Sequence, residues 1–254
     1  CVIALSGPRR TCYERRVSTS IPSVNFEDYR QGGAARARFV SQVGTALRDV
    51  GFFSVHGHGI PDSLFENAYA EARKFFALPA DAKAPYDSKP YNGQRGHTHF
   101  GREHAKDATA PDLKEFYQVG RTNVADDHKV HASYGPNVWP KDEVPGFQGA
   151  MTALYEGLDH LGGALLEACA AFIGEPEGLF RDMATESDTI LRIIHYPPIQ
   201  AGTDEKAVRA AAHEDINFIT LLPGATADGL EVLQRDGSWL PIRADFRDIV
   251  VDSG

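Results

Sequence analysis

Apolar residues recur at helical spacing in three stretches of the chain. Over residues 33–50 they predict an amphipathic helix whose apolar face consists of Phe39, Val40, Val43, Leu47 and Val50. A second helix is predicted over residues 61–78, because Pro61 suits the first turn of a helix. The longest stripe runs through residues 146–173 and contains Met151, Leu154, Leu158, Leu161, Leu165 and Phe172. Such a stripe indicates a long helix buried along one side.

Short β-type runs dominate the chain after Pro176. Turn residues separate these runs, which cover residues 189–198, 216–224, 229–234, 239–242 and 248–254. Asp236-Gly237 is a strong hairpin signal between two of them. An earlier run covers residues 52–55, and another near residues 115–120 lies within a polar, glycine-rich region from 85 to 145. Long loops of that kind usually serve a functional site.

The order of these elements predicts an α+β protein. We expect an N-terminal helical region packed on a C-terminal jelly roll, because several short strands in series are typical of a sandwich or barrel. The expected divisions are residues 17–145, with the long loops, and residues 146–254, with the long helix and the jelly roll. Residues 1–16 show no structural period and begin with Cys, so we expect a non-native or disordered extension, with Val17 as the natural start.

Composition narrows the class of protein. Of the 254 residues, 42% are hydrophobic and 24% are charged, as in globular proteins. A formal net charge of -9 argues against a general nucleic-acid binder, which needs a basic surface. No apolar run reaches membrane-spanning length, so we expect no membrane partner. The three Cys form no paired framework, which favours a reducing, cytoplasmic setting.

The stretch AAHEDINFITLL, residues 211–222, carries candidate metal chemistry. On a strand, alternate residues point to the same side, so His213 and Asp215 would project together. An imidazole nitrogen and a carboxylate suit a divalent first-row metal, and one more His would complete the facial triad of non-haem Fe(II). The simpler alternative is a surface His beside an Asp that caps a turn.

The strand predicted at LRIIHYPP offers a second candidate site. Arg192 and Tyr196 would share one face of the strand, and His195 would point to the other. An inward Arg in an apolar barrel is costly unless it meets an anion. Arg192 or Tyr196 could therefore contact a substrate or cosubstrate carboxylate. Alternatively, Arg192 pairs with an internal Asp or Glu.

Five motifs in order resemble the isopenicillin N synthase-like family of Fe(II) oxygenases, most of which depend on 2-oxoglutarate. The motifs are GFFSVHGHGIP, KFFALPADAK, FGREHAKDATAPDLKEFYQVGR, LRIIHYPP and AAHEDINFITLL. The resemblance implies a double-stranded β-helix, with His213 and Asp215 as two iron ligands and Tyr196 beside the cosubstrate or substrate. It also implies that dioxygen, Fe(II) and 2-oxoglutarate together oxidise a small molecule by hydroxylation, desaturation or ring closure.

The sequence departs from the family pattern after Asp215. The family has a third ligand, a His, and then an Arg and a Ser that bind 2-oxoglutarate, and no His follows His213 here. We therefore expect a jelly roll that is truncated at the C-terminus, inactive as a fragment, and with partly uncovered inward residues, namely Ile219, Leu221, Val232 and Ile249. Three alternatives stay open: a non-catalytic jelly-roll binding protein, an oxidase that works without 2-oxoglutarate, and a zinc hydrolase.

Other histidines are weaker metal candidates. His58 belongs to the GFFSVHGHGIP motif, where we expect it to hold a turn through hydrogen bonds. His97, His99 and His104 have a spacing that could bind zinc, but they lie in the predicted loop region. We expect none of them to complete the iron site.

Overall fold

The computed structural model divides into two compact units that interleave along the chain. Unit 1 comprises Cys1–Ser6, Ile60–His160 and Met183–Glu214, and unit 2 comprises Gly7–Gly59, Leu161–Asp182 and Asp215–Gly254. The structure describes residues 2–6, 21–91, 93–102, 113–122, 134–185, 187–198, 209, 212–224, 229–234, 237–242, 245 and 247–253. No boundary falls at residue 145, because both predicted halves of the chain contribute to each unit.

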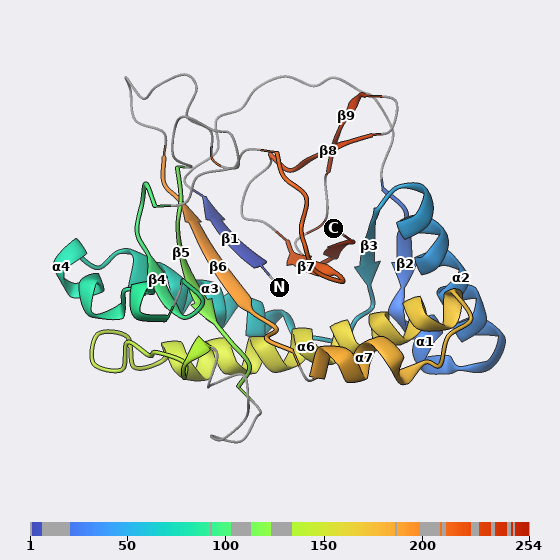
Figure 1. The fold of residues 1–254 in the computed structure, drawn as a ribbon, viewed down its shortest axis with the longest axis horizontal. Coiled ribbons are helices and arrows are strands. Elements are labelled where there is room, and N and C mark those ends of the chain that lie inside the picture. The colour runs from blue at the N-terminus through green and yellow to red at the C-terminus, as the bar shows by residue number, and fades with distance from the viewer. Residues whose placement is uncertain are drawn as a thin grey trace. The chain divides into compact units, whose positions relative to one another are not determined.

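Unit 1 is built on a four-stranded sheet in the order β1-β6-β5-β4 (Figure 1). Its strands are β1 (Val2–Ser6), β4 (Gly96–Thr98), β5 (Glu115–Val119) and β6 (Leu191–Tyr196). β5 pairs antiparallel with both β4 and β6, whereas β1 pairs parallel with β6. Val2–Ser6 is therefore not disordered, because the structure places it in a sheet, whereas the prediction that residues 1–16 are non-native stays a prediction; residues 7–16 lie outside the described part.

Helices cover one face of this sheet through an aromatic core. The helical elements of unit 1 are α3 (Asp62–Phe76), α4 (Ala80–Lys83), η1 (Ala84–Tyr86), η2 (Lys89–Tyr91) and the first part of α6 (Phe147–Phe172). The rings of Phe75 and Phe147 lie 4.9 Å from the ring of Tyr117 on β5, centroid to centroid. All three side chains are fully buried, so this face of the sheet packs on helices and not on solvent.

Unit 2 contains a second four-stranded sheet, in the order β2-β3-β10-β7. Its strands are β2 (Ser23–Asn25), β3 (Phe52–His56), β7 (Thr220–Pro223) and β10 (Ile249–Asp252). All four residues of β10 are buried, because it lies between β3 and β7 and both of its faces are covered. A hairpin of β8 (Glu231–Leu233) and β9 (Trp239–Pro241) adds Val232 and Leu240 to the same apolar core.

The helices of unit 2 follow the predicted apolar stripes closely. They are α1 (Phe26–Gln31), α2 (Gly33–Asp49), the last part of α6 (Phe147–Phe172) and most of α7 (Gly178–Thr185). Phe39 and Val43 are buried on α2 as predicted, but Val50 is exposed beyond its end and Ala46 is buried instead. The stripe of α6 is buried from Met151 to Leu165, which confirms the prediction of a core helix.

The HGHGIP turn after β3 is held by the side chain of Arg30 from α1 and by the backbone of the segment before β10. Arg30 donates hydrogen bonds to the backbone carbonyl oxygens of Gly57 and His58. A Cβ atom at Gly59 would lie 2.4 Å from Nη2 of Arg30, so a side chain has no room there. Nε2 of His58 lies 2.7 Å from the carbonyl oxygen of Arg247, which confirms the predicted role of His58 in holding a turn.

The four C-terminal residues that were expected to be partly uncovered are mostly buried. Leu221, Val232 and Ile249 expose 2%, 7% and 1% of their surface, and only Ile219 is partly exposed. The expectation of uncovered core residues is therefore wrong for these three. The physical reason is that β7, β8 and β10 pair with strands and core residues from elsewhere in unit 2.

Candidate functional site

His213 and Asp215 lie in an irregular segment and not in a strand. Residues 212–219 have no regular secondary structure, and β7 begins at Thr220. The predicted strand at the metal motif is therefore wrong, and so is the argument that strand alternation aligns the two side chains. The boundary between the units falls after Glu214, so His213 belongs to unit 1 and Asp215 to unit 2. His213 is exposed and Asp215 is partly exposed.

Side chains at the start of β7 fix the position of the Asp215 carboxylate. The hydroxyl of Thr220 donates a short hydrogen bond to Oδ2 of Asp215. The amide of Asn217 lies 3.0 Å from the same hydroxyl oxygen and can donate to it. Thr220 itself is 3% exposed and belongs to the sheet of unit 2, so it is a rigid anchor. One carboxylate oxygen is therefore oriented by the protein while the residue stays open to solvent.

The two faces of β6 have different surroundings, as the sequence predicted. Leu191 and Ile193 are fully buried on the helix-covered face, where His195 stacks on Phe76 of α3. Arg192, Ile194 and Tyr196 occupy the other face. The Arg192 guanidinium carbon lies 4.6 Å from the ring centroid of Phe116 on β5, which is the cross-strand partner of Ile194 on β6. Arg192 thus contacts an aromatic ring, which was not predicted, and both Arg192 and Tyr196 are partly exposed.

A buried carboxylate cluster lies on the helix-covered face of the same sheet. Glu115, at the start of β5, is 2% exposed, and its Oε2 accepts hydrogen bonds from Nζ of Lys83 and from His97, both at 2.8 Å. Its Oε1 lies 2.9 Å from Nδ1 of His195. The sequence analysis missed this cluster, because its members lie 18 to 80 residues apart and no motif spacing joins them. An acidic residue that directly precedes Phe116 and Tyr117 at the start of a predicted strand was the available signal.

Burial and hydrogen bonding pull the pKa values of this cluster in opposite directions. Burial raises the pKa of Glu115, but hydrogen bonds from His195, His97 and Lys83 outweigh it and lower the pKa to about 2. Burial lowers the pKa of His97, and Glu115 only partly opposes this effect. Nδ1 of His97 is buried with no hydrogen-bond partner among the described residues, which also disfavours a proton there. Near neutral pH the cluster therefore holds an ionised Glu115 and a neutral His97.

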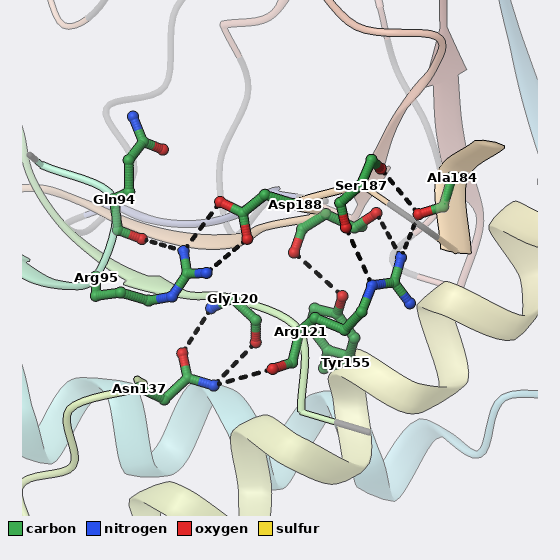
Figure 2. A network of polar contacts seen from close by, with 10 residues as sticks. Gln94, Arg95, Gly120, Arg121, Asn137, Tyr155, Ala184, Ser187 and Asp188 are labelled. Atoms are coloured by element: carbon green, nitrogen blue, oxygen red, sulfur yellow. Dashed lines mark hydrogen bonds and ion pairs between the residues drawn. The ribbon is translucent and has the colours of Figure 1, made fainter. Parts of the chain in front are cut away.

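Two arginines anchor the segment that leads into β6 (Figure 2). Arg95 is 1% exposed and forms a two-pronged ion pair with Asp188, with N–O distances of 3.1 and 2.5 Å. Arg121 donates hydrogen bonds to the backbone carbonyls of Ala184 and Ser187, at 2.7 and 3.2 Å. Bidentate charge-assisted contacts of this kind are strong and directional. They fix Ala184, Ser187 and Asp188, and therefore the start of β6, within unit 1.

Gly120 is required by this arginine arrangement. A Cβ atom at Gly120 would lie 2.0 Å from Cζ of Arg95, so any side chain would displace the guanidinium. The backbone N–H of Gly120 donates to Oδ1 of Asn137 at 2.7 Å, and its carbonyl accepts from Nδ2 at 3.0 Å (Figure 2). The glycine of the EFYQVGR motif is thus explained by packing and not by backbone conformation.

The donor chemistry at residues 213 and 215 fits two ligands of a non-haem Fe(II) site. Because one residue separates them, the chain keeps their Cα atoms within about 7 Å. An imidazole and an oriented carboxylate are ligand types that Fe(II) accepts. No group of three His, Cys, Asp or Glu side chains that could hold a metal occurs within the described ranges. A third protein ligand is therefore not found in the part of the chain that the structure describes.

The remaining histidines do not form a zinc site where they are described. His97 is buried against Glu115, and its ring lies 4.4 Å from that of His99 in an edge-on contact. Nε2 of His99 lies 3.3 Å from a carboxylate oxygen of Asp87. His104 lies outside the described residues, and His160 is an exposed residue of α6.

Known proteins match this chain over most of its length. A family model described as non-haem dioxygenase in morphine synthesis N-terminal matches residues 21–142. The 2-oxoglutarate-Fe(II) type oxidoreductase hxnY of Emericella nidulans is 31% identical over 93% of this chain and 70% of its own length. The 2-oxoglutarate-dependent dioxygenase caaD of Aspergillus niger is 30% identical over 92% of this chain and 73% of its own length.

Solved structures give the same result for the fold. A 2OG-Fe(II) oxygenase family protein from Caulobacter crescentus has a TM-score of 0.81 and 37% identity, covering 93% of this chain and 74% of its own. A Neurospora crassa protein, solved in complex with alpha-KG and thymine, has a TM-score of 0.78 and 26% identity, covering 92% and 73%. The fold is thus that of the jelly-roll oxygenases. The chain belongs to the family of non-haem Fe(II)- and 2-oxoglutarate-dependent oxygenases, which are oxidoreductases with Fe(II) and 2-oxoglutarate as cofactors.

Proposed function

We propose that His213 and Asp215 are two of the protein ligands of the catalytic iron. The observation that supports this most directly is the Thr220 hydroxyl, which orients the Asp215 carboxylate while the residue remains partly open to solvent. His213, one residue away along the chain, is exposed and supplies a nitrogen ligand. Fe(II) bound there would supply the redox chemistry by which dioxygen oxidises 2-oxoglutarate and a small-molecule substrate together.

We further propose that the face of β6 that carries Arg192 and Tyr196 contacts the small molecules of the reaction. Tyr196 would contact 2-oxoglutarate, and Arg192 would attract an anionic group of the cosubstrate or substrate. Support comes from their shared face, from the partial exposure of both residues, and from Phe116, which holds the guanidinium of Arg192 over its ring. A guanidinium held in this way loses little side-chain entropy when it binds a carboxylate.

The relatives and the cysteine pattern support proposals on the class of protein and on its cellular location. The relatives named above act with 2-oxoglutarate, which favours a small-molecule oxygenase over a non-catalytic binding protein or a 2-oxoglutarate-independent oxidase. Within the described ranges, no helix is long and apolar enough to cross a membrane. We propose a cytoplasmic location on the basis of the cysteine pattern of the sequence.

Metal titration tests the ligand assignment without turnover. Mn(II) can replace Fe(II) anaerobically because both accept nitrogen and oxygen ligands. We expect His213→Ala and Asp215→Ala to weaken Mn(II) binding by on the order of a hundredfold, since each removes a metal ligand. His160→Ala, which removes another exposed histidine of unit 1, is the matched control and should bind like the wild type. Equal Mn(II) affinity in all four proteins would show that the metal binds elsewhere.

A further inference from the structure

The buried Glu115 cluster is arranged asymmetrically around its carboxylate. Oε2 accepts hydrogen bonds from Lys83 on α4 and from His97 on β4. Oε1 accepts from Nδ1 of His195 on β6. One oxygen therefore anchors Glu115 to a helix and to the neighbouring strand, and the other oxygen holds β6. Burying a carboxylate costs several kcal/mol, and the three donors offset this cost.

The bond to His195 closes the last rung between β5 and β6. Glu115 and His195 are direct cross-strand partners, and β5 begins at Glu115. Beyond this rung the chain continues as Tyr196, Pro197 and Pro198, and proline has no N–H for a ladder. The pairing with β5 therefore ends at His195, and β5 influences the position of Tyr196 only through His195.

Aromatic contacts hold the His195 ring in place as well. The ring stacks on Phe76 with a centroid distance of 5.1 Å and an interplanar angle of 27°. Phe100 approaches its edge at 6.4 Å. The imidazole is thus fixed by a hydrogen bond and by two rings, although 27% of its side chain is exposed.

We propose that Glu115 and His195 are positioning residues for Tyr196, and that their hydrogen bond sets the affinity for 2-oxoglutarate. His195 and Tyr196 are adjacent and point to opposite faces of β6. When the imidazole is tied to Glu115, the backbone at the end of β6 has one orientation, and the Tyr196 ring is directed to the face that also carries Arg192. This inference rests on the proposed contact of Tyr196 with 2-oxoglutarate.

The test compares two donors to the same carboxylate. His195→Leu removes the donor on β6, whereas Lys83→Met removes a donor on α4, away from β6. 2-Oxoglutarate affinity is measured with the Mn(II)-loaded protein as the shift of the thermal midpoint with ligand concentration, which needs no turnover. We expect His195→Leu to weaken 2-oxoglutarate binding about tenfold, as typical for partners behind a binding residue. Lys83→Met should lower the midpoint without ligand but leave the affinity unchanged.

Conservative variants separate positioning from folding. His195→Asn places an amide N–H where Nδ1 was, so it should recover most of the affinity lost in His195→Leu. If His195→Leu does not fold, Glu115→Gln gives the same comparison. This variant keeps the shape of the side chain but removes its charge, which weakens the hydrogen bonds from His195, His97 and Lys83. Wild-type affinity in His195→Leu or Glu115→Gln, or an equal loss in Lys83→Met, would overturn the positioning role.

Tyr196→Leu distinguishes failure of this inference from failure of the proposed function. A Tyr196→Leu protein with wild-type 2-oxoglutarate affinity would refute the proposed contact, and the positioning role with it. A weakened Tyr196→Leu protein beside a normal His195→Leu protein would refute only the positioning role. Weakening in both, with normal affinity in Lys83→Met, is the result that supports the inference.

Discussion

Histidine and carboxylate side chains occur together in two regions of this protein with opposite surroundings. Around Glu115 the carboxylate, Lys83 and His97 are buried, and both carboxylate oxygens accept hydrogen bonds from basic side chains. At residues 213–215 the histidine is exposed and the carboxylate is partly open, with one oxygen oriented by Thr220. The same residue types therefore form buried hydrogen bonds that hold the fold together in one region, and face solvent in the other.

The difference has an electrostatic cause. A divalent cation at Glu115 would have to displace the Lys83 ammonium, which lies 2.8 Å from the carboxylate, and would repel it in a low-dielectric interior. The hydroxyl that orients Asp215 is neutral, and it leaves the negative charge of the carboxylate in place for a cation. A metal motif is thus recognised by the charge and burial of its surroundings as much as by the donors themselves.

The largest effect on stability should come from removing the buried carboxylate. Glu115→Leu leaves the Lys83 ammonium buried without its partner, which typically costs about 3–5 kcal/mol of unfolding free energy. Urea denaturation of the wild type and the variant measures the difference. The double variant Glu115→Leu/Lys83→Met is the control and should be closer to the wild type. A single variant as stable as the double would contradict the role of the ion pair.

The unfolding free energy should depend on pH through the ionisation of the same cluster. The pKa of Glu115 is lowered from 4.5 to about 2, so its stabilisation is present above pH 4.5 and is lost as the pH falls towards 2. The pKa of His97 is lowered from 6.5, so its unfolded form takes up a proton first and stability begins to fall below pH 6.5. Unfolding free energy measured from pH 8 to pH 3 should therefore decline in two stages. His97→Asn should remove the upper stage alone.

A smaller loss should follow from filling the space at Gly120. Gly120→Ala places a Cβ against the Arg95 guanidinium, and overpacking of this kind costs about 1–3 kcal/mol. Thermal denaturation measures the change. Gly149→Ala is the matched control, because a Cβ there meets nothing within 4 Å. Equal midpoints for the two variants would show that the Arg95–Asp188 pair can shift at no cost.

The smallest effect on stability should come from the proposed metal ligands. His213 is exposed, so His213→Ala without metal should change the unfolding free energy by no more than about 0.5 kcal/mol. Asp215→Ala should cost about 1 kcal/mol, because Thr220 loses this acceptor. Urea denaturation of the metal-free proteins checks both values. If either variant lost as much unfolding free energy as Glu115→Leu, the region at residues 213–215 would be as important for stability as the Glu115 cluster, which contradicts the comparison.

The types of secondary-structure element and the family could be predicted from the amino-acid sequence alone. The stripe from Met151 to Leu165 predicted the long helix, because a period of 3.6 residues is visible within one segment. The five ordered motifs indicated the oxygenase family, which the relatives confirm. The alternation of Arg192 and Tyr196 against His195 was also readable, because strand geometry fixes which neighbours share a face.

The contacts between residues that lie far apart in the sequence became visible only in the folded structure. The parallel pairing of Val2–Ser6 with β6 joins segments of unit 1 that lie far apart in the sequence, and Glu115 gathers partners from 32 residues before it to 80 after it. Local propensity gives no information on such contacts, because their free energy depends on burial and on partners that spacing along the chain does not specify. The irregular backbone at His213 was missed for the same reason. Its apolar, β-branched pattern suits a strand, but pairing with β10 begins only at Thr220.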